Sequence, residues 1–204
     1  MGAEKISFTD HAPFPGNPFG NRMDIEQLDE YLSTLKALRK KYFEQIKIEI
    51  GLEAEYIPAF KYYYKTLLKD KKLDYLVLGQ HMFFDGIDYS FSWTAEKKNA
   101  EEHTGLVNSM IEGIETGFFK YVAHPDRAFR RLKVWTPQAE ELSKKLIEAA
   151  VKAQIPLEKN LSSMEKPHNF RPEFWSLVPE NHPVIYGVDA HSTAEFERIA
   201  KKIK

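Results

Sequence analysis

Strand-like apolar runs alternate with helix-like segments along this chain, and that alternation most constrains its fold. Six apolar runs of strand length are separated by stretches in which apolar residues recur with a helical period. The runs are Lys5–Thr9, Ile46–Leu52, Tyr75–Leu78, Phe118–Ala123, Ile155–Leu157 and Val184–Val188. Because alternating strands and helices pair in parallel through right-handed crossovers, we predict an α/β fold of about six βα units.

Capping residues mark the starts of several of the predicted helices. Capping-box spacing is found at Asp24 with Gln27 and at Ser192 with Glu195, and Thr136 stands before a proline. A Ser, Thr or Asp at this position accepts a hydrogen bond from a free backbone N–H of the first turn. These signals place helix starts after three of the predicted strands.

Side chains that can bind metal ions stand at the carboxyl ends of five of the six predicted strands. They are His11, Glu53, His81, His124, and the pair Asp189 and His191. In a parallel α/β barrel these strand ends open at one mouth, where active sites are built, so we predict a barrel that gathers them there. The chain has no cysteine, and imidazole with carboxylate is a ligand set for zinc, iron or manganese.

Each of these residues also has an ordinary explanation when it is taken alone. A single histidine after a strand is usually a loop residue or a hydrogen-bonded core residue, and only the repetition argues for a metal site. We expect Glu55 and Asp126 to be exposed or to support the ligands, His103 to lie on a helix surface, and His182 to lie in a loop. Packing under loops, more than a substrate wall, is expected for most of Phe14, Phe19, Phe83, Phe84 and Trp93.

Five short motifs that contain these residues resemble, in order and in wording, the PHP (polymerase and histidinol phosphatase) family. The motifs are TDHAP, GLEAEYIP, GQH, AHPD and VDAH, and they extend from about Ile6 to His191. The stretches SFTDHAP and DYLVLGQHMFFDG, with the EYIP continuation, look most like the histidinol-phosphatase branch. The resemblance therefore covers nearly the whole chain.

The resemblance implies a distorted (βα)7-type barrel with up to three divalent metals at its mouth. It implies that Glu53 bridges the first and second metals, that His81 and His124 complete the second, that Asp189 binds the first, and that His11 and His191 bind the third. The family opens with a strand that carries HxH, and no histidine precedes His11 here. Under this resemblance only the second site keeps all its ligands, so we expect fewer metals than three.

The first residues suggest a reason for that difference. Met1-Gly2-Ala3 resembles the end of a helix with its terminal glycine, followed directly by a strand. We therefore expect a first strand and helix of about 25–35 residues, the usual size of a βα unit, to be absent. An open barrel leaves an unpaired strand edge, through which the chain could form a homo-oligomer.

The resemblance implies a metal-dependent phosphoesterase that hydrolyses a small phosphomonoester by a metal-activated hydroxide, with histidinol phosphate as the leading candidate. Glu53 and Asp189 would then be catalytic, and Arg171 and Arg127 would bind the phosphate, because a planar guanidinium can hold two phosphate oxygens. The alternative is a non-catalytic or inactive truncated relative that binds at most one or two metals. A proofreading exonuclease is disfavoured because the chain has no basic groove.

Length and charge narrow the class further. With 204 residues and a net charge of −1, the chain fits one domain, residues 1–204, and gives no sign of a nucleic-acid or membrane surface. Lys and Arg alternate with Asp and Glu along the helices, which is typical of solvated faces. We expect a cytoplasmic protein with a small phosphoester as its partner and without nucleic acid or membrane partners.

Overall fold

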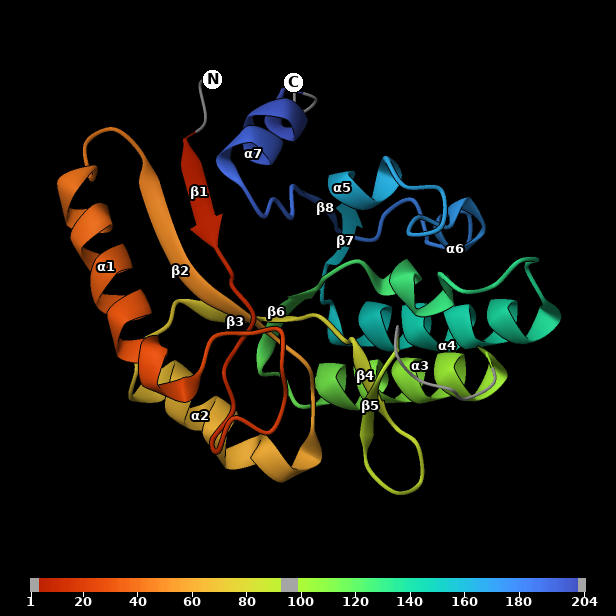
Figure 1. The fold of residues 1–204 in the computed structure, drawn as a ribbon. Helices are drawn as coiled ribbons and strands as arrows, with labels where there is room; N and C mark the ends of the chain where they lie inside the picture. Colours follow the sequence, from red (N-terminus) through yellow and green to blue (C-terminus); the bar gives the residue numbers. More distant parts are fainter. Residues whose placement is uncertain (1–3, 93–98, 202–204) are drawn as a thin grey trace.

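A curved sheet of six parallel strands runs through the molecule (Figure 1). The computed structural model describes residues 4–92 and 99–201. In sheet order the strands are β1 (Lys5–Phe8), β2 (Lys47–Ala54), β3 (Tyr75–Leu78), β6 (Phe119–Val122), β7 (Leu157–Asn160) and β8 (Val184–Gly187). Among the described strands, β1 pairs only with β2 and β8 only with β7, so the sheet is a half-barrel.

Each strand of this sheet is followed by at least one helix. Helix α1 (Leu28–Lys41) follows β1, α2 (Lys61–Lys69) follows β2, α3 (Asn99–Glu115) follows β3, α4 (Pro137–Ala153) follows β6, α5 (Leu161–Met164) and α6 (Pro172–Trp175) follow β7, and α7 (Thr193–Ala200) follows β8. Short 3-10 helices lie at Ile25–Gln27 (η1), Pro58–Phe60 (η2) and Pro125–Phe129 (η3). The predicted α/β fold of six βα units is confirmed.

The hydrophobic core lies between the sheet and the helices that cover its convex face (Figure 1). In α1 the buried residues Leu28, Leu32 and Leu35 recur with the helical period and face this core. The predicted caps are present, since the Thr136 side chain accepts from Ala139 N and the Asp24 capping box is formed. Local signals and packing therefore agree along these helices.

The opposite face of the sheet, inside the half-barrel, carries charged side chains beside a small apolar cluster of Tyr75, Val77 and Ala123. In β2, Ile48, Ile50 and Leu52 enter the core, so Glu49 and Glu53, which alternate with them, project to the inner side. Burial opposes the charge on Glu49, but ion pairs with surrounding lysines outweigh it and lower its pKa to about 2. Those lysines are Lys47 at 3.0 Å, Lys5 at 3.3 Å and Lys120 at 3.5 Å.

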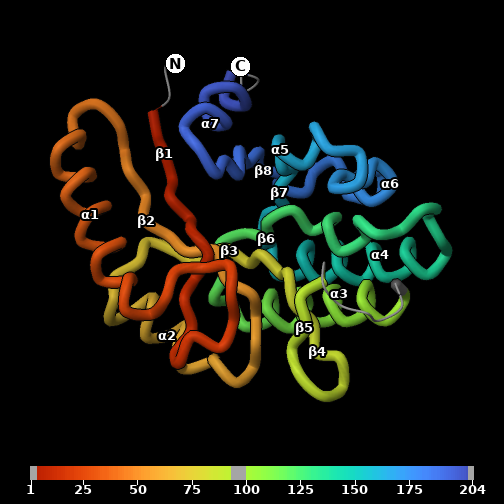
Figure 2. The backbone as a smooth tube through the Cα atoms, in the orientation of Figure 1, coloured from red at the N-terminus to blue at the C-terminus, as the bar shows by residue number. Residues whose placement is uncertain are grey.

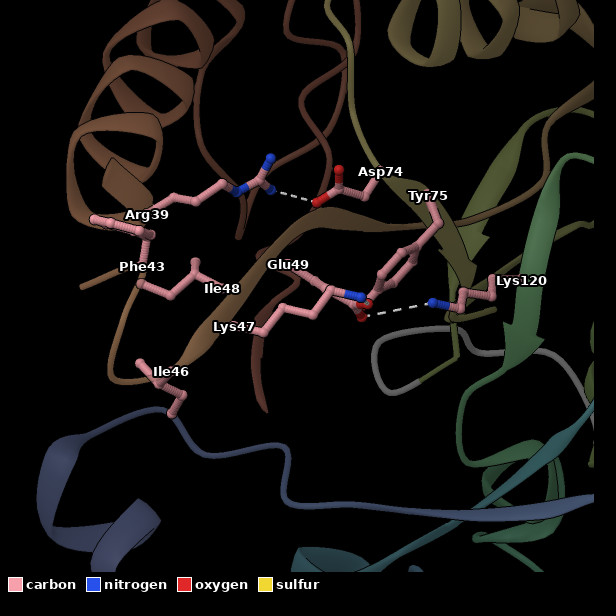
Figure 3. A pocket seen from close by; sticks show the side chains of 9 residues that line it. All are labelled: Arg39, Phe43, Ile46, Lys47, Ile48, Glu49, Asp74, Tyr75 and Lys120. Carbon is pink, nitrogen blue, oxygen red and sulfur yellow. Dashed lines mark hydrogen bonds and ion pairs between the residues drawn. The ribbon is translucent and has the colours of Figure 1, made fainter. Parts of the chain in front are cut away.

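The pocket in Figure 3 lies at the amino-terminal ends of the strands, around Glu49. Lys47 at the start of β2 and Tyr75 at the start of β3 line it, together with Arg39 of α1, which forms an ion pair with Asp74. None of the residues predicted to bind metal or substrate lines this pocket. The predicted site therefore has to be sought at the other end of the strands.

Some boundaries differ from the sequence prediction. Strand β2 extends to Ala54, so Glu53 lies inside the strand and not after it. The run predicted at Ile155–Leu157 is displaced to β7, where Glu158 and Asn160 escaped the apolar criterion because they face the half-barrel interior. An antiparallel hairpin of β4 (Met82–Phe84) and β5 (Tyr89–Phe91) was not predicted. Trp93 and the Met1-Gly2-Ala3 segment lie outside the described residues.

Two long excursions leave the same end of the sheet, namely the connection from β1 to α1 and the hairpin β4–β5. Figure 2 shows both projecting towards the bottom of the view, beyond the carboxyl end of β1.

None of the helices in the described part of the chain has both the length and the apolar character needed to cross a membrane.

Candidate metal centre

Glu53, His81 and His124 meet at the carboxyl ends of neighbouring strands. His124 Nε2 lies 3.1 Å from Glu53 Oε1, and His81 Nε2 lies 3.6 Å from the same oxygen. All three residues are buried, and one ligand atom from each lies within 4.8 Å of the other two. We call these three residues the Glu53 group. Two imidazoles and a carboxylate at these separations suit a divalent cation.

The order of the strands creates this arrangement. Glu53 of β2 is in register with Val77 of β3, and His81 and His124 follow the adjacent strands β3 and β6. His124 has φ 31° and ψ 54°, a left-handed conformation that is uncommon for residues other than glycine. Its backbone N–H donates to Glu158 Oε2 at 3.1 Å, which holds this turn in place at the entry to η3.

The surroundings favour the protonation states that bind cations. Burial opposes the charge on Glu53, but the hydrogen bond with His124 and the neighbouring imidazoles of His81 and His11 outweigh it and lower its pKa. Burial, aided by the positive charge of Arg127, lowers the pKa of His124 to about 4. At neutral pH the group therefore offers a carboxylate and an unprotonated His124 ring, which are the ligand forms of these side chains.

A second group shares His81 with the first. It consists of His11, Glu55 and His81, again with ligand atoms within 4.8 Å of one another, and we call it the Glu55 group. His81 Nδ1 lies 3.2 Å from Glu55 Oε1. The carboxylate of Glu55 also forms a buried ion pair with Arg22, whose Nη1 lies 2.9 Å from Oε2. His11 Nδ1 is buried and has no hydrogen-bond partner among the described residues.

Asp189 lies beside the Glu53 group, and His191 lies apart from it. Asp189 Oδ2 accepts hydrogen bonds from Arg127 Nη2 at 2.6 Å and from Asn160 Nδ2 at 3.1 Å. Its carboxylate is close enough to His124 for their interaction to help lower the pKa of Asp189 against the effect of burial. The side chain of His191 is 70% exposed, and within the described residues neither it nor Asp189 belongs to a three-ligand group.

The two arginines predicted to bind phosphate have different surroundings. Arg127 donates to Ser163 Oγ at 2.9 Å and to Asp189, so its guanidinium stands next to the site. Arg171 Nε donates to the carbonyl oxygen of Phe129, and its Nη2 donates to those of Arg130 and Leu132. The contacts of Arg171 therefore hold the chain after η3, whereas those of Arg127 face the candidate centre.

Three residues of this region were missed or undervalued by sequence reasoning. Arg22 carried no motif. Glu55, which was expected to be exposed or to support the ligands, is fully buried and lies 3.2 Å from His81 Nδ1, which excludes exposure and fits the supporting role. Glu158 is buried on β7, and burial together with the charges of Glu53 and Asp189 raises its pKa to about 8. Sequence reasoning could have singled out Glu158 because it directly follows the apolar residue Leu157 within a strand, and a carboxylate is rarely buried there without a partner.

The expectation for His103 was wrong. Its side chain is buried in α3, where its ring contacts that of Phe129 at a centroid distance of 5.6 Å. The reason is that α3 is covered by α4 and η3, a tertiary contact that helical periodicity alone does not reveal. Asp126 is buried and accepts the backbone N–H of Arg171, which fits a supporting role and not exposure. His182 lies outside helices and strands, as predicted.

Comparison with known proteins matches this chain to one family model, that of the PHP domain, over residues 1–162. The histidinol-phosphatase of Bacillus subtilis (strain 168) is 24% identical over 225 residues, covering 95% of this chain and 84% of that protein. A candidate histidinol-phosphatase of Deinococcus radiodurans is 26% identical over 133 residues, which cover 61% of this chain. The match spans only half the length of the Deinococcus protein, at 50%.

Two solved structures share the fold. The hisK protein of Listeria monocytogenes, described as a candidate histidinol phosphatase, superposes with a TM-score of 0.81 at 17% identity, covering 98% of this chain and 89% of that one. The histidinol phosphate phosphatase of Lactococcus lactis gives a TM-score of 0.70 at 18% identity, covering 99% and 81%. That structure is a complex with zinc, L-histidinol and phosphate.

Proposed function

This chain belongs to the PHP domain family, and from that premise we propose that it is a metal-dependent phosphoesterase acting on a small phosphomonoester. L-histidinol phosphate is the leading candidate substrate, because both curated relatives carry histidinol-phosphatase names. The observation that carries the proposal is the Glu53 group, in which ligand atoms of three buried residues lie within 4.8 Å of one another. Buried titratable side chains that converge with perturbed pKa values are typical of functional sites.

Glu53, His81 and His124 would hold the divalent cation, with zinc, iron and manganese all compatible with nitrogen and carboxylate ligands. Such a cation, when bound, lowers the pKa of a coordinated water to about 7 and offsets negative charge on phosphoryl oxygens. The low pKa of Glu53 and of His124 supports this assignment, since neither ligand has to lose a proton near neutral pH. The additional ligand roles of His11, Asp189 and His191 remain predictions.

The residues around the cation would orient the phosphate. Arg127 is fixed by Ser163 and Asp189 at the edge of the Glu53 group, where its guanidinium would donate to phosphate oxygens. Asp189 would hold Arg127 in place and add a carboxylate to the site. Burial of the Glu53 group excludes bulk water and strengthens each of these interactions.

An inactive relative that binds one or two cations is the second candidate. The observation in its favour is that His191 is largely exposed and that, among the described residues, Asp189 joins no three-ligand group. A chain with only the Glu53 group complete would bind a single cation. Such a chain would lack a second bound cation to offset charge on the phosphoryl oxygens.

Elemental analysis of the purified chain, run beside an assay of phosphate release from L-histidinol phosphate, tests both candidates. The phosphatase proposal expects bound metal and turnover, both lost in His124→Ala. One tightly bound metal without turnover would support the inactive relative, and a metal content unchanged in His124→Ala would contradict the ligand assignment. The cytoplasmic location and the absence of nucleic-acid partners remain predictions.

A further inference from the structure

A buried ion pair stands directly behind the candidate centre, on the side of His81 that faces away from Glu53. Arg22 Nη1 lies 2.9 Å from Glu55 Oε2, and Arg22 Nη2 lies 3.1 Å from Oε1. The two side chains are 3% and 1% exposed. A second bond from Nη1, at 3.1 Å to the carbonyl oxygen of Ala12, ties the guanidinium to the chain beyond β1. Both oxygens of Glu55 are therefore already bound by a fixed cation.

Aromatic rings enclose this guanidinium. Its central carbon lies 5.4 Å from the ring centre of Phe14 and 5.8 Å from those of Phe19 and Phe91. Phe14 and Phe19 belong to the connection between β1 and α1, and Phe91 belongs to the hairpin strand β5. These are the two excursions that project together in Figure 2. Cation–π contacts in a desolvated pocket hold the positive charge in one position.

His81 is the residue that both three-ligand groups share. Its Nε2 lies 3.6 Å from Glu53 Oε1, and its Nδ1 lies 3.2 Å from Glu55 Oε1. A divalent cation in the Glu55 group would have to share Glu55 with the guanidinium of Arg22 and would be repelled by it at low dielectric. Within residues 4–92 and 99–201, the ion pairs of the Glu53 carboxylate are with His81 and His124 and not with an arginine or lysine, so a cation in the Glu53 group meets no such competitor there.

We propose that Arg22 acts as the resident cation of the Glu55 group. Arg22 neutralises Glu55, so Glu55 accepts the Nδ1–H of His81 and leaves Nε2 for a cation at Glu53. Arg22 and Glu55 are then positioning residues, which direct a divalent ion to the Glu53 group and keep it out of the Glu55 group. The claim that Arg22 and Glu55 direct a divalent ion to the Glu53 group rests on the proposed function, since it requires that the Glu53 group binds a cation.

Titration of the chelator-stripped full chain with Co²⁺, followed by visible absorption and calorimetry, tests the exclusion. Arg22→Met frees Glu55 and is expected to gain a second binding event, which disappears in the double variant Arg22→Met with Glu55→Gln. A double variant Arg22→Met with Glu55→Leu, whose side chain cannot accept the Nδ1–H of His81, should bind Co²⁺ at the Glu53 group about 10- to 100-fold more weakly, because His81 has then lost the acceptor that orients it. Arg39→Met removes an arginine–carboxylate pair at the other end of the strands and should change neither quantity.

Two results would overturn the inference. One is a Glu55-dependent binding event already present with Arg22 in place, and the other is a folded Arg22→Met chain that gains no second event. If the unmodified chain binds no Co²⁺ and His124→Ala changes nothing, the proposed function fails instead. Long-range ¹H–¹⁵N NMR of the unmodified chain then decides the positioning role without any variant, because His81 must carry a proton on Nδ1. A neutral ring protonated only at Nε2 would refute it.

Discussion

The carboxylate of Glu53 occupies the space that a side chain at position 79 would fill. A Cβ atom placed on Gly79 would overlap Oε1, Cδ and Cγ of Glu53. Gly79 follows β3, and its N–H donates to the carbonyl oxygen of Ala54 at 3.1 Å, so the backbone there is fixed by the strand next to it. The glycine thus provides room for the central residue of the candidate centre.

Gly79→Ala is therefore expected to displace the Glu53 carboxylate and to abolish cation binding at the Glu53 group while the fold persists. Calorimetric titration with Zn²⁺ measures the binding, and circular dichroism checks the fold. Gly20→Ala is the matched control, because nothing lies within 4 Å of a Cβ at that position. If Gly79→Ala bound Zn²⁺ as tightly as the unmodified chain, the Glu53 carboxylate would not have to occupy its observed position for the cation to bind.

Glu158 makes the stability of the metal-free chain depend on pH. Its pKa rises from 4.5 to about 8 in the folded chain, because of burial and of the charges on Glu53 and Asp189. Between pH 4.5 and 8 the folded state keeps a proton that the unfolded state releases, so stability falls as pH rises through this window. By the linkage relation the loss is about 5 kcal/mol at most.

Glu158→Gln should remove this decline, since its amide stays neutral and can still accept the His124 N–H. Urea unfolding at pH 5, 6, 7 and 8 in the presence of a chelator measures it. The free energy of unfolding of the unmodified chain should drop over the series, and that of the variant should drop less. Parallel curves for the two proteins would argue against a protonated Glu158 in the folded state.

Much of the candidate site was predictable because its residues follow parallel strands. His81 and His124 were found from their place after apolar runs, and strand adjacency then brings them together. Arg22 could not be found this way, because it lies in a loop and reaches Glu55 across 33 residues through tertiary structure alone. Periodicity identifies what enters the core, but it does not identify which buried charges face one another.

The fold could be predicted from the sequence to a similar extent. Alternation of strands and helices indicated six parallel units, and these are present. The hairpin β4–β5 was missed because its residues, such as Phe83 and Phe84, were treated as loop aromatics after His81. Strand β7 was displaced because Glu158 and Asn160 are polar residues that face the interior of the half-barrel. In both cases the local pattern was weaker than the tertiary environment.

The open edge of β1 predicts self-association. At both ends of the β1–β2 pairing, backbone N–H groups of β2 donate to the carbonyl oxygens of even-numbered residues, Glu4 and Asp10. Because the backbone groups of successive strand residues point to opposite sides, the N–H of the odd-numbered Ser7 points to the unpaired side. Such an edge can add a strand from a second copy. Sedimentation velocity over a concentration series should show dimers, and Ser7→Pro, which removes that N–H, should weaken them. A monomer at all concentrations would contradict the prediction.

Substitution of Arg127 is expected to lower catalytic activity, whereas substitution of Arg171 is expected to lower stability. Arg127→Met removes a guanidinium that stands beside the Glu53 group, so kcat/KM for L-histidinol phosphate should fall about 10- to 100-fold, the equivalent of one or two charged hydrogen bonds. The planar guanidinium of Arg127 also donates to Asp189 and Ser163. An ammonium group cannot reproduce this forked geometry, so Arg127→Lys should recover only part of the loss.

Arg171→Met should instead lower stability, because three backbone carbonyl oxygens of residues 129, 130 and 132 lose their donor together. We expect a cost of about 2–4 kcal/mol in the free energy of unfolding, with kcat/KM per folded molecule nearly unchanged. Urea unfolding and steady-state kinetics on the same two preparations separate the cases. A large rise in KM for Arg171→Met at unchanged stability would restore Arg171 as the phosphate-binding arginine, as the sequence resemblance first implied.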